Sequence, residues 1–240
     1  MAKQLKADVV EHKNYVGGRY SVLSEVGMLP AELMDLEEKK FKRLNYLINN
    51  KRFINNLIQN VASTLSLIKN NKNLSIILNY DQRSDNLLSW YQQLIAESLG
   101  KKSKGILPVV STMPKDNHSL MQFFLDGSKK SFYTFFSVSE KNSNKFNNKY
   151  LLKSHSYLKN KNLNEIINAQ MQATQNIFKR KKIPFRSFKI LKRNEQSLGE
   201  IFCFFILETI LLGRALKVNP FDQPSVELVK RETKKILLNN

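Results

Sequence analysis

Two polar side chains near the end of one predicted helix have the types and spacing for acid–base chemistry on a bound ligand. An apolar repeat predicts a helix over Asp85–Ser98, ending before Gly100, and Glu97 lies in its last turn. The carbonyls at a helix C-terminus are partly negative, so a carboxylate there takes up a proton readily, as a general base must. Gln93 lies one turn earlier on the same face, so its amide and the carboxylate can contact one ligand.

His118 is a third candidate. It follows an apolar run that predicts a buried strand over Ile106–Ser111, and we expect it in the loop beyond the C-terminal end of that strand. Open α/β sheets bind ligands at this edge. Taken alone, these residues are better explained as a solvated glutamate at a helix end and an ordinary polar histidine in a loop.

The elements that must position these side chains alternate between strand and helix. Apolar runs predict strands, and helical periodicity predicts helices. The strands are Leu74–Tyr80, Ile106–Ser111, a segment from Ser131 and Phe185–Ile190, with a fragment at Val9 and Val10; the helices are Phe53–Ile68, Asp85–Ser98, Ser119–Leu125, Leu163–Phe178, Gln196–Leu216 and Ser225–Leu238. A polar, mobile connection is expected over Glu140–Asn162. The pattern predicts an α/β fold with a doubly wound, mostly parallel sheet flanked by helices and a helical C-terminal region.

Paired glycines precede an arginine near the start of the chain. Gly17 and Gly18 permit positive φ and a close approach of the backbone to a ligand, so Arg19 can be held near an anion. An ordinary turn is the alternative, and the pattern of a P-loop is absent.

The charge of the chain narrows the classes of partner. The 39 Lys and Arg residues outnumber 20 Asp and Glu residues, for a net charge of +19. Such a charge attracts nucleic acid or a small anion such as a sugar phosphate. Lysine and asparagine are interleaved along the chain and no nucleic-acid-binding motif is present, so no specific nucleic-acid partner is expected. Any polyanion binding should weaken with salt.

The remaining reactive residues predict neither a metal nor a cofactor. Cys203 is the only cysteine and lies in an apolar helical run, which favours a buried thiol. The three histidines lack the spacing of a metal site. No signal peptide is evident, and Ile201–Gly213 is too short to span a membrane, so no membrane partner and a cytoplasmic location are expected.

Five stretches in order along the chain resemble the glucose-6-phosphate isomerase family. They are VGGRYSVLSEVGMLP at Val16–Pro30, AESLGK at Ala96–Lys101, KDNHS at Lys115–Ser119, SLGE at Ser197–Glu200 and NPFDQPSVELVK at Asn219–Lys230. Five ordered matches are far more specific than one short motif. The resemblance implies a sugar-isomerase (SIS-like) fold. It also implies the cofactor-free interconversion of glucose 6-phosphate and fructose 6-phosphate through a cis-enediol.

The resemblance also implies a role for each matching residue. Glu97 would carry the proton between C2 and C1, and Arg19 would stabilise the developing enediolate. His118, with the assistance of Lys230, would open the sugar ring; the family supplies this histidine from the neighbouring subunit, which implies a homodimer. The substrate-binding residues would be Gln93, Gln223 and Gly18. In SVELVK, Ser225 and Val229 stand where the family typically has glycine.

Family members are about twice as long, and their N-terminal half grips the phosphate with a GGS-type turn and an SKTFTT loop. Neither motif occurs here. We therefore expect residues 1–240 to form a single C-terminal sugar-isomerase domain, with the N-terminal sugar-phosphate-binding domain absent. Its parts would be an entry segment (1–30), an α/β core (31–195) and C-terminal helices (196–240).

Three functions remain open from the sequence. The first is a truncated or split isomerase, as a homodimer or in complex with a separate N-terminal half. The second is a remnant domain that binds a sugar phosphate without catalysis. The third is a basic protein that binds nucleic acid.

Overall fold

The chain forms two compact units, each assembled from separate stretches of sequence. The computed structural model describes residues 2–139, 145, 149 and 151–239. Unit 1 comprises Met1–Ser66, Gln93–Ile106 and Leu198–Asn240, and unit 2 comprises Leu67–Gln92 and Leu107–Ser197. Three of the boundaries therefore fall within helices, and the fourth falls at the start of a strand, Leu107–Thr112. The division into residues 1–30, 31–195 and 196–240 remains a prediction.

Unit 2 is built on a four-stranded sheet in which every pairing is parallel. The strands are β1 (Leu74–Asn79), β2 (Leu107–Thr112), β3 (Ser131–Val138) and β4 (Phe185–Ile190), in the order β2-β1-β3-β4. In this register, Leu74 of β1 pairs with Leu107 on one side and Ser131 on the other. The central strands β1 and β3 are buried along nearly their whole length, which explains their continuous apolar runs. The predicted parallel sheet is confirmed.

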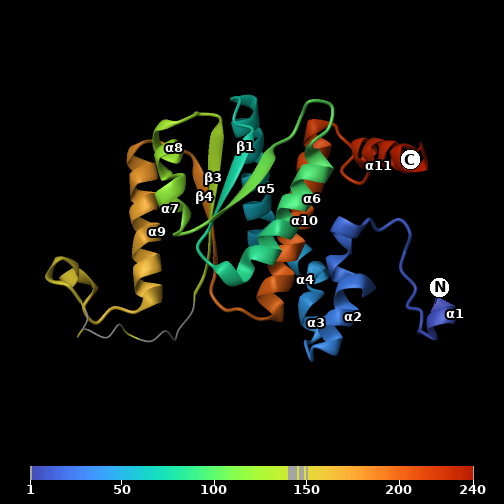
Figure 1. Cartoon of the computed structure of the whole chain (residues 1–240), viewed down its shortest axis with the longest axis horizontal. Helices are drawn as coiled ribbons and strands as arrows, with labels where there is room; N and C mark the ends of the chain where they lie inside the picture. Colours follow the sequence, from blue (N-terminus) through green and yellow to red (C-terminus); the bar gives the residue numbers. More distant parts are fainter. Residues whose placement is uncertain (1, 140–144, 146–148, 150, 240) are drawn as a thin grey trace. The chain divides into compact units, whose positions relative to one another are not determined.

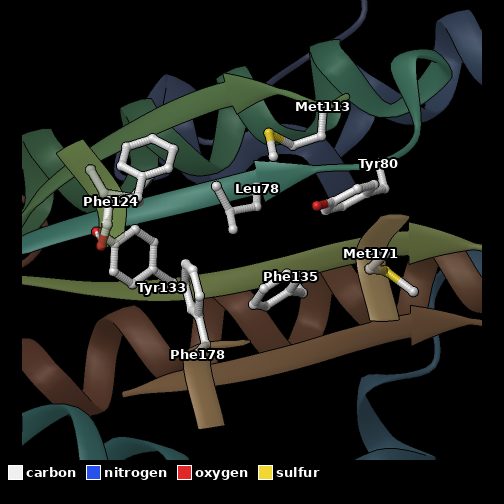
Figure 2. Packing of buried hydrophobic residues seen from close by; sticks show 9 residues of the cluster. Leu78, Tyr80, Met113, Phe124, Tyr133, Phe135, Met171 and Phe178 are labelled. Atoms are coloured by element: carbon white, nitrogen blue, oxygen red, sulfur yellow. Dashed lines mark hydrogen bonds between the residues drawn. The ribbon is translucent and has the colours of Figure 1, made fainter. Parts of the chain in front are cut away.

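Helices cover both faces of this sheet. The helical elements of unit 2 are η2 (Gln82–Ser84), the first half of α6 (Asp85–Leu99), α7 (Asp116–Ser119), α8 (Met121–Asp126), η4 (Lys153–Leu158) and α9 (Leu163–Arg180). α8 and α9 lie on one face (Figure 1), where Phe124 and Phe178 pack edge-on against Tyr133 (Figure 2). On the other face, Arg186 of β4 donates to Tyr91 of α6 at 2.8 Å. The expected doubly wound arrangement follows from this layering.

Unit 1 is entirely helical in secondary structure within its described residues. Its elements are α1 (Ala2–Leu5), η1 (Gly18–Leu23), α2 (Glu25–Leu33), α3 (Glu38–Phe41), α4 (Leu44–Ile48), most of α5 (Lys51–Lys69), the second half of α6, most of α10 (Glu195–Leu216) and α11 (Pro224–Asn239). Gly199 of α10 lies against the backbone of Phe41, because a Cβ at Gly199 would be 2.2 Å from the Phe41 carbonyl oxygen. The glycine of the SLGE motif thus permits close packing of α10 on α3.

α10 buries the two reactive groups that the sequence places in it. Cys203 is buried, and burial, with a smaller effect of the Glu200 charge, raises the pKa of its thiol to about 11. The prediction of a buried thiol is confirmed. Glu208 accepts a hydrogen bond from Asn60 of α5. Within the part of the chain that the structure describes, no helix has both the length and the apolar character needed to cross a membrane.

Some predictions of secondary structure were wrong, and one lies partly outside the described residues. Val9 and Val10 form no strand: residues 7–13 have neither helix nor strand, because no neighbouring strand supplies hydrogen bonds to them. No periodic pattern predicted α2, α3 and α4, which are short. Of the connection expected over Glu140–Asn162, residues 140–144, 146–148 and 150 are not among the described residues.

Candidate active site

The guanidinium of Arg19 is the centre of the candidate site in unit 1. Arg19 follows Gly18 at the start of η1 and is only 4% exposed. Its Nη1 lies 3.3 Å from Glu97 Oε2 and 3.3 Å from Gln223 Oε1. Three of the residues predicted from sequence therefore converge, although they come from three distant parts of the chain.

Three further acceptors complete the surroundings of Arg19. Its Nε donates to Ser98 Oγ at 2.9 Å, and its Nη2 donates to the backbone oxygens of Pro220 and Asp222 at 2.8 and 2.9 Å. These five acceptors match the five N–H groups of a guanidinium. Burial of the charge is therefore compensated by hydrogen bonds and by one carboxylate.

Glu97 faces both the buried guanidinium and solvent. It lies in the last full turn of α6, and 26% of its side chain is exposed. Gln93 Nε2 donates to Glu97 Oε1 at 3.0 Å, so the two side chains lie on one face of the helix, as predicted. The carboxylate is thus oriented by Arg19 on one oxygen and Gln93 on the other, and remains accessible to a ligand.

Tyr20 supports the arginine from the neighbouring position in η1. Its hydroxyl lies 3.0 Å from Ser98 Oγ and donates to the Pro220 carbonyl at 3.1 Å, and its ring packs against Phe221 with centroids 5.3 Å apart. Burial raises the pKa of the Tyr20 hydroxyl above its usual value, despite the opposing effects of Ser98 and Arg19. The motifs GGRYS, AESLGK and NPFDQ are therefore held together by one hydrogen-bond network.

The two glycines before Arg19 do not adopt the positive φ that glycine permits. Gly17 has φ −65°, and among the described glycines only Gly105 has positive φ. The freedom for positive φ is therefore not used at Gly17 or Gly18, because η1 begins directly from an extended residue. A Cβ at Gly18 would meet no atom within 4 Å, so the space beside this residue is open.

His118 lies in unit 2, in a helix rather than a loop. α7 is a single turn that begins at Asp116, whose carboxylate accepts hydrogen bonds from Ser111 Oγ and the Thr112 backbone N–H, both at 2.8 Å. The prediction of a loop was wrong because these bonds turn the chain into a helix at the end of β2. The His118 side chain is exposed and has no hydrogen-bond partner among the described residues.

Lys230 does not join the Arg19 network. It lies in the second turn of α11, 60% of its side chain is exposed, and its ammonium contacts Glu227 on the same helix at 2.8 Å. Gln223 immediately precedes α11, and its side chain contacts Arg19, as the backbone oxygens of Pro220 and Asp222 do.

Sequence reasoning missed Ser98, Tyr20, Lys101 and Asp222. The only available signal was their position within the matching motifs, since each is adjacent to, or within four residues of, a residue that was chosen. Lys101 donates to Asp222 Oδ1 at 2.6 Å, and this hydrogen bond is the main reason why the pKa of the Asp222 carboxyl lies below its usual range.

One cavity of unit 2 has none of the predicted site residues in its lining. It has a volume of about 560 Å³ and is lined by residues that follow β1 and β2, by the end of β3 and by the first turns of α9. This is the carboxyl edge of the sheet, where ligands of α/β folds often bind. His118 is not among its lining residues.

A comparison with protein families shows which family the chain belongs to. The family profile described as phosphoglucose isomerase matches residues 5–240. The chain belongs to the phosphoglucose isomerase family. This membership confirms the resemblance predicted from the five motifs. The residues around Arg19 therefore belong to a member of this family.

The relatives of this family member are considerably longer. A glucose-6-phosphate isomerase of Mycoplasmopsis pulmonis is 35% identical over 229 residues, covering 92% of this chain and 54% of the relative. A probable glucose-6-phosphate isomerase of Methanococcus maripaludis is 32% identical, covering 90% of this chain and 50% of the relative. The chain thus spans about half the length of the curated relatives it matches.

Solved structures share the fold. A hypothetical protein of Thermus thermophilus superposes with a TM-score of 0.88 at 24% identity, covering 98% of this chain and 59% of that protein. A glucose-6-phosphate isomerase of Chlamydia trachomatis superposes with a TM-score of 0.68 at 16% identity, covering 95% and 48%. The predicted fold class is confirmed by these likenesses.

Proposed function

We propose that this chain supplies the acid–base chemistry of a glucose-6-phosphate isomerase. The single observation that carries the proposal is the contact of Glu97 with the buried guanidinium of Arg19, at 3.3 Å, in a member of the phosphoglucose isomerase family. The contact unites an accessible carboxylate with a fixed positive charge, which an enolisation requires.

Glu97 is the proposed base. Starting from open-chain fructose 6-phosphate, its carboxylate removes a proton from C1, and the electron pair of the broken C–H bond forms the C1–C2 double bond of a cis-enediolate. The carbonyl oxygen at C2 takes the negative charge and then a proton. Return of the proton from Glu97 to C2, with loss of the C1 hydroxyl proton, gives glucose 6-phosphate.

Arg19 contributes as a charge rather than as a flexible donor. Its five N–H groups face five protein acceptors, so it stays fixed while the enediolate forms nearby. A charge that is already oriented stabilises the transition state without reorganising when the reaction occurs. We propose that the sugar hydroxyls contact Gln93 and Gln223. The substrate would also approach Gly18, where the space beside the backbone is open.

His118 and Lys230 are the proposed groups for ring opening. Both side chains are exposed, and the charged end of Lys230 is held only by a surface pair with Glu227, which is readily broken. We propose that His118 acts in the active site of a second subunit of a homodimer.

A phosphate-binding part outside these residues completes the proposed enzyme. α11 exposes Val226, Leu228, Val229, Ile236, Leu237 and Leu238 to solvent. Exposed apolar side chains of this kind are suited to contact with a further protein surface. We propose that the protein surface that contacts α11 belongs to the N-terminal part of the isomerase, supplied in the same or a separate chain. A cytoplasmic location stays a prediction.

The test is conversion of fructose 6-phosphate to glucose 6-phosphate by the purified chain, with and without the N-terminal half of a homologous enzyme. Turnover only with the added half supports the proposed division of labour, and turnover by the chain alone supports catalysis without it. A folded chain that binds the sugar phosphate but never turns it over would replace the proposal with a non-catalytic binding domain.

A further inference from the structure

Lys101 is an almost buried lysine whose ammonium is held by one short loop. Only 11% of its side chain is exposed. Its Nζ donates to the backbone oxygens of Asn219 and Asp222 and, at 2.6 Å, to Asp222 Oδ1. Three acceptors match the three N–H groups of an ammonium, so the side chain has one orientation.

The loop that Lys101 holds is the one that carries Gln223 to the candidate site. Arg19 Nη2 donates to the backbone oxygens of Pro220 and Asp222. The Asp222 backbone oxygen therefore accepts hydrogen bonds from both Arg19 and Lys101. Within the loop, Asn219 Oδ1 accepts from the Phe221 backbone N–H at 3.1 Å. The loop is thus fixed between two cations immediately before Gln223.

The segment that presents Lys101 is itself constrained. Lys102 and Ser103 both have positive φ, 53° and 56°, a conformation that residues with a Cβ seldom adopt. Lys104 then donates to the Leu216 carbonyl at 3.0 Å, at the C-terminus of α10. Such local strain persists only where surrounding contacts enforce it, and it is concentrated at functional sites.

We infer that Lys101 is a positioning residue: it clamps the Asn219–Gln223 loop so that the Gln223 amide stays beside Arg19 and Glu97. The inference deepens the proposed function and rests on it for the identity of the substrate. The clamp itself is a property of this chain and is measurable without turnover.

The experiment compares the full chain with K101M, K101R and K102M. Methionine keeps the length of lysine and removes the charge, arginine restores the charge, and Lys102 is an exposed neighbour that serves as control. Hydrogen exchange followed by mass spectrometry should show faster exchange of residues 219–226 in K101M by at least about tenfold, partial recovery in K101R and no change in K102M. Exchange in β1 and β3 should be the same in all four proteins.

Kinetics separate positioning from a structural role. With the N-terminal half added, K101M should lose roughly 10- to 100-fold in kcat, the scale on which misplacement of a substrate contact acts, while its melting temperature changes little. Unchanged exchange at 219–226 in K101M would overturn the inference whatever the activity. Equal acceleration of exchange throughout unit 1 would also overturn it. Local acceleration in a chain that never turns over would uphold the clamp and contradict the proposed function.

Discussion

The guanidinium of Arg19 and the carboxylate of Glu97 lie 3.3 Å apart, although 78 residues separate them in the chain. Only 3% of the arginine side chain is exposed, compared with 26% of the glutamate. The buried cation is therefore the fixed member of the pair, and the glutamate is the member that a ligand can reach.

The geometry of Arg19 predicts that lysine cannot replace it. R19K keeps the charge but offers three N–H groups to five acceptors, and an unsatisfied buried acceptor costs about 1–3 kcal/mol. We expect R19K to lower the free energy of unfolding by at least about 2 kcal/mol. Urea denaturation measures this loss. R231K, at an exposed arginine, is the control, and equal stability of the two variants would contradict the described network.

Close packing at Gly199 predicts a steric effect on stability. A Cβ there would lie 2.2 Å from the Phe41 carbonyl, so G199A forces α10 away from α3. Overpacking of this kind costs about 1–3 kcal/mol. At Gly18 the same substitution meets open space, so thermal unfolding of G18A should match the wild type. A G199A protein as stable as G18A would show that α10 and α3 do not approach as described.

The left-handed backbone at Ser103 predicts a stabilising substitution. This conformation costs a residue with a Cβ about 1–2 kcal/mol, which glycine does not pay. Glycine also has more conformational freedom in the unfolded chain, and this lowers the gain in stability by about 0.4–1 kcal/mol. S103G should therefore raise the free energy of unfolding by about 0.5–1 kcal/mol. S103A keeps the Cβ and should give no increase. The prediction fails if both variants respond alike in chemical denaturation.

The surroundings of Asp116 predict a dependence of stability on pH. Burial alone would raise the pKa of this carboxyl. Hydrogen bonds from Ser111, the Thr112 backbone and Ser119 together lower it by more, so the pKa lies below its usual range. A lowered folded-state pKa contributes stability that is present above the unfolded value of about 3.9 and is lost as pH falls through the folded value.

The variant D116N tests this dependence. Its deficit in the free energy of unfolding relative to wild type should be largest near pH 7 and shrink as pH approaches 3. The control D8N, at an exposed residue, should show no deficit at either pH. A deficit of the same size at both pH values would mean that the Asp116 charge is not what stabilises α7.

Local patterns predicted the parts of the site that lie close together in sequence. Gln93 and Glu97 share one helix face because they are four residues apart, and the parallel sheet follows from buried apolar runs separated by helices. The motifs singled out Arg19 and Gln223, but no periodicity could show that they meet, since 204 residues separate them. Such contacts depend on tertiary packing.

The errors have a similar cause. Val9 and Val10 are strand-forming residues, yet a strand requires a neighbour, and the sheet is formed elsewhere in the chain. The turn of helix around His118 depends on hydrogen bonds from Ser111 and Thr112 to Asp116, which sequence periodicity does not reveal. Lys101 was missed because a lysine in a basic loop is usually solvated, whereas here it is nearly buried.

The central claim is that Glu97 moves the proton between C1 and C2. The measurement that tests it most directly is NMR of fructose 6-phosphate incubated in deuterated water with the chain and the N-terminal half of a homologous enzyme. A carboxyl base exchanges part of its proton with solvent, so deuterium should enter C1 of fructose 6-phosphate and C2 of glucose 6-phosphate. E97Q should lower this rate by about 100- to 10,000-fold, and E32Q, at an exposed glutamate, should leave it unchanged. Incorporation by E97Q at the rate of wild type would contradict the assignment of Glu97 as the base.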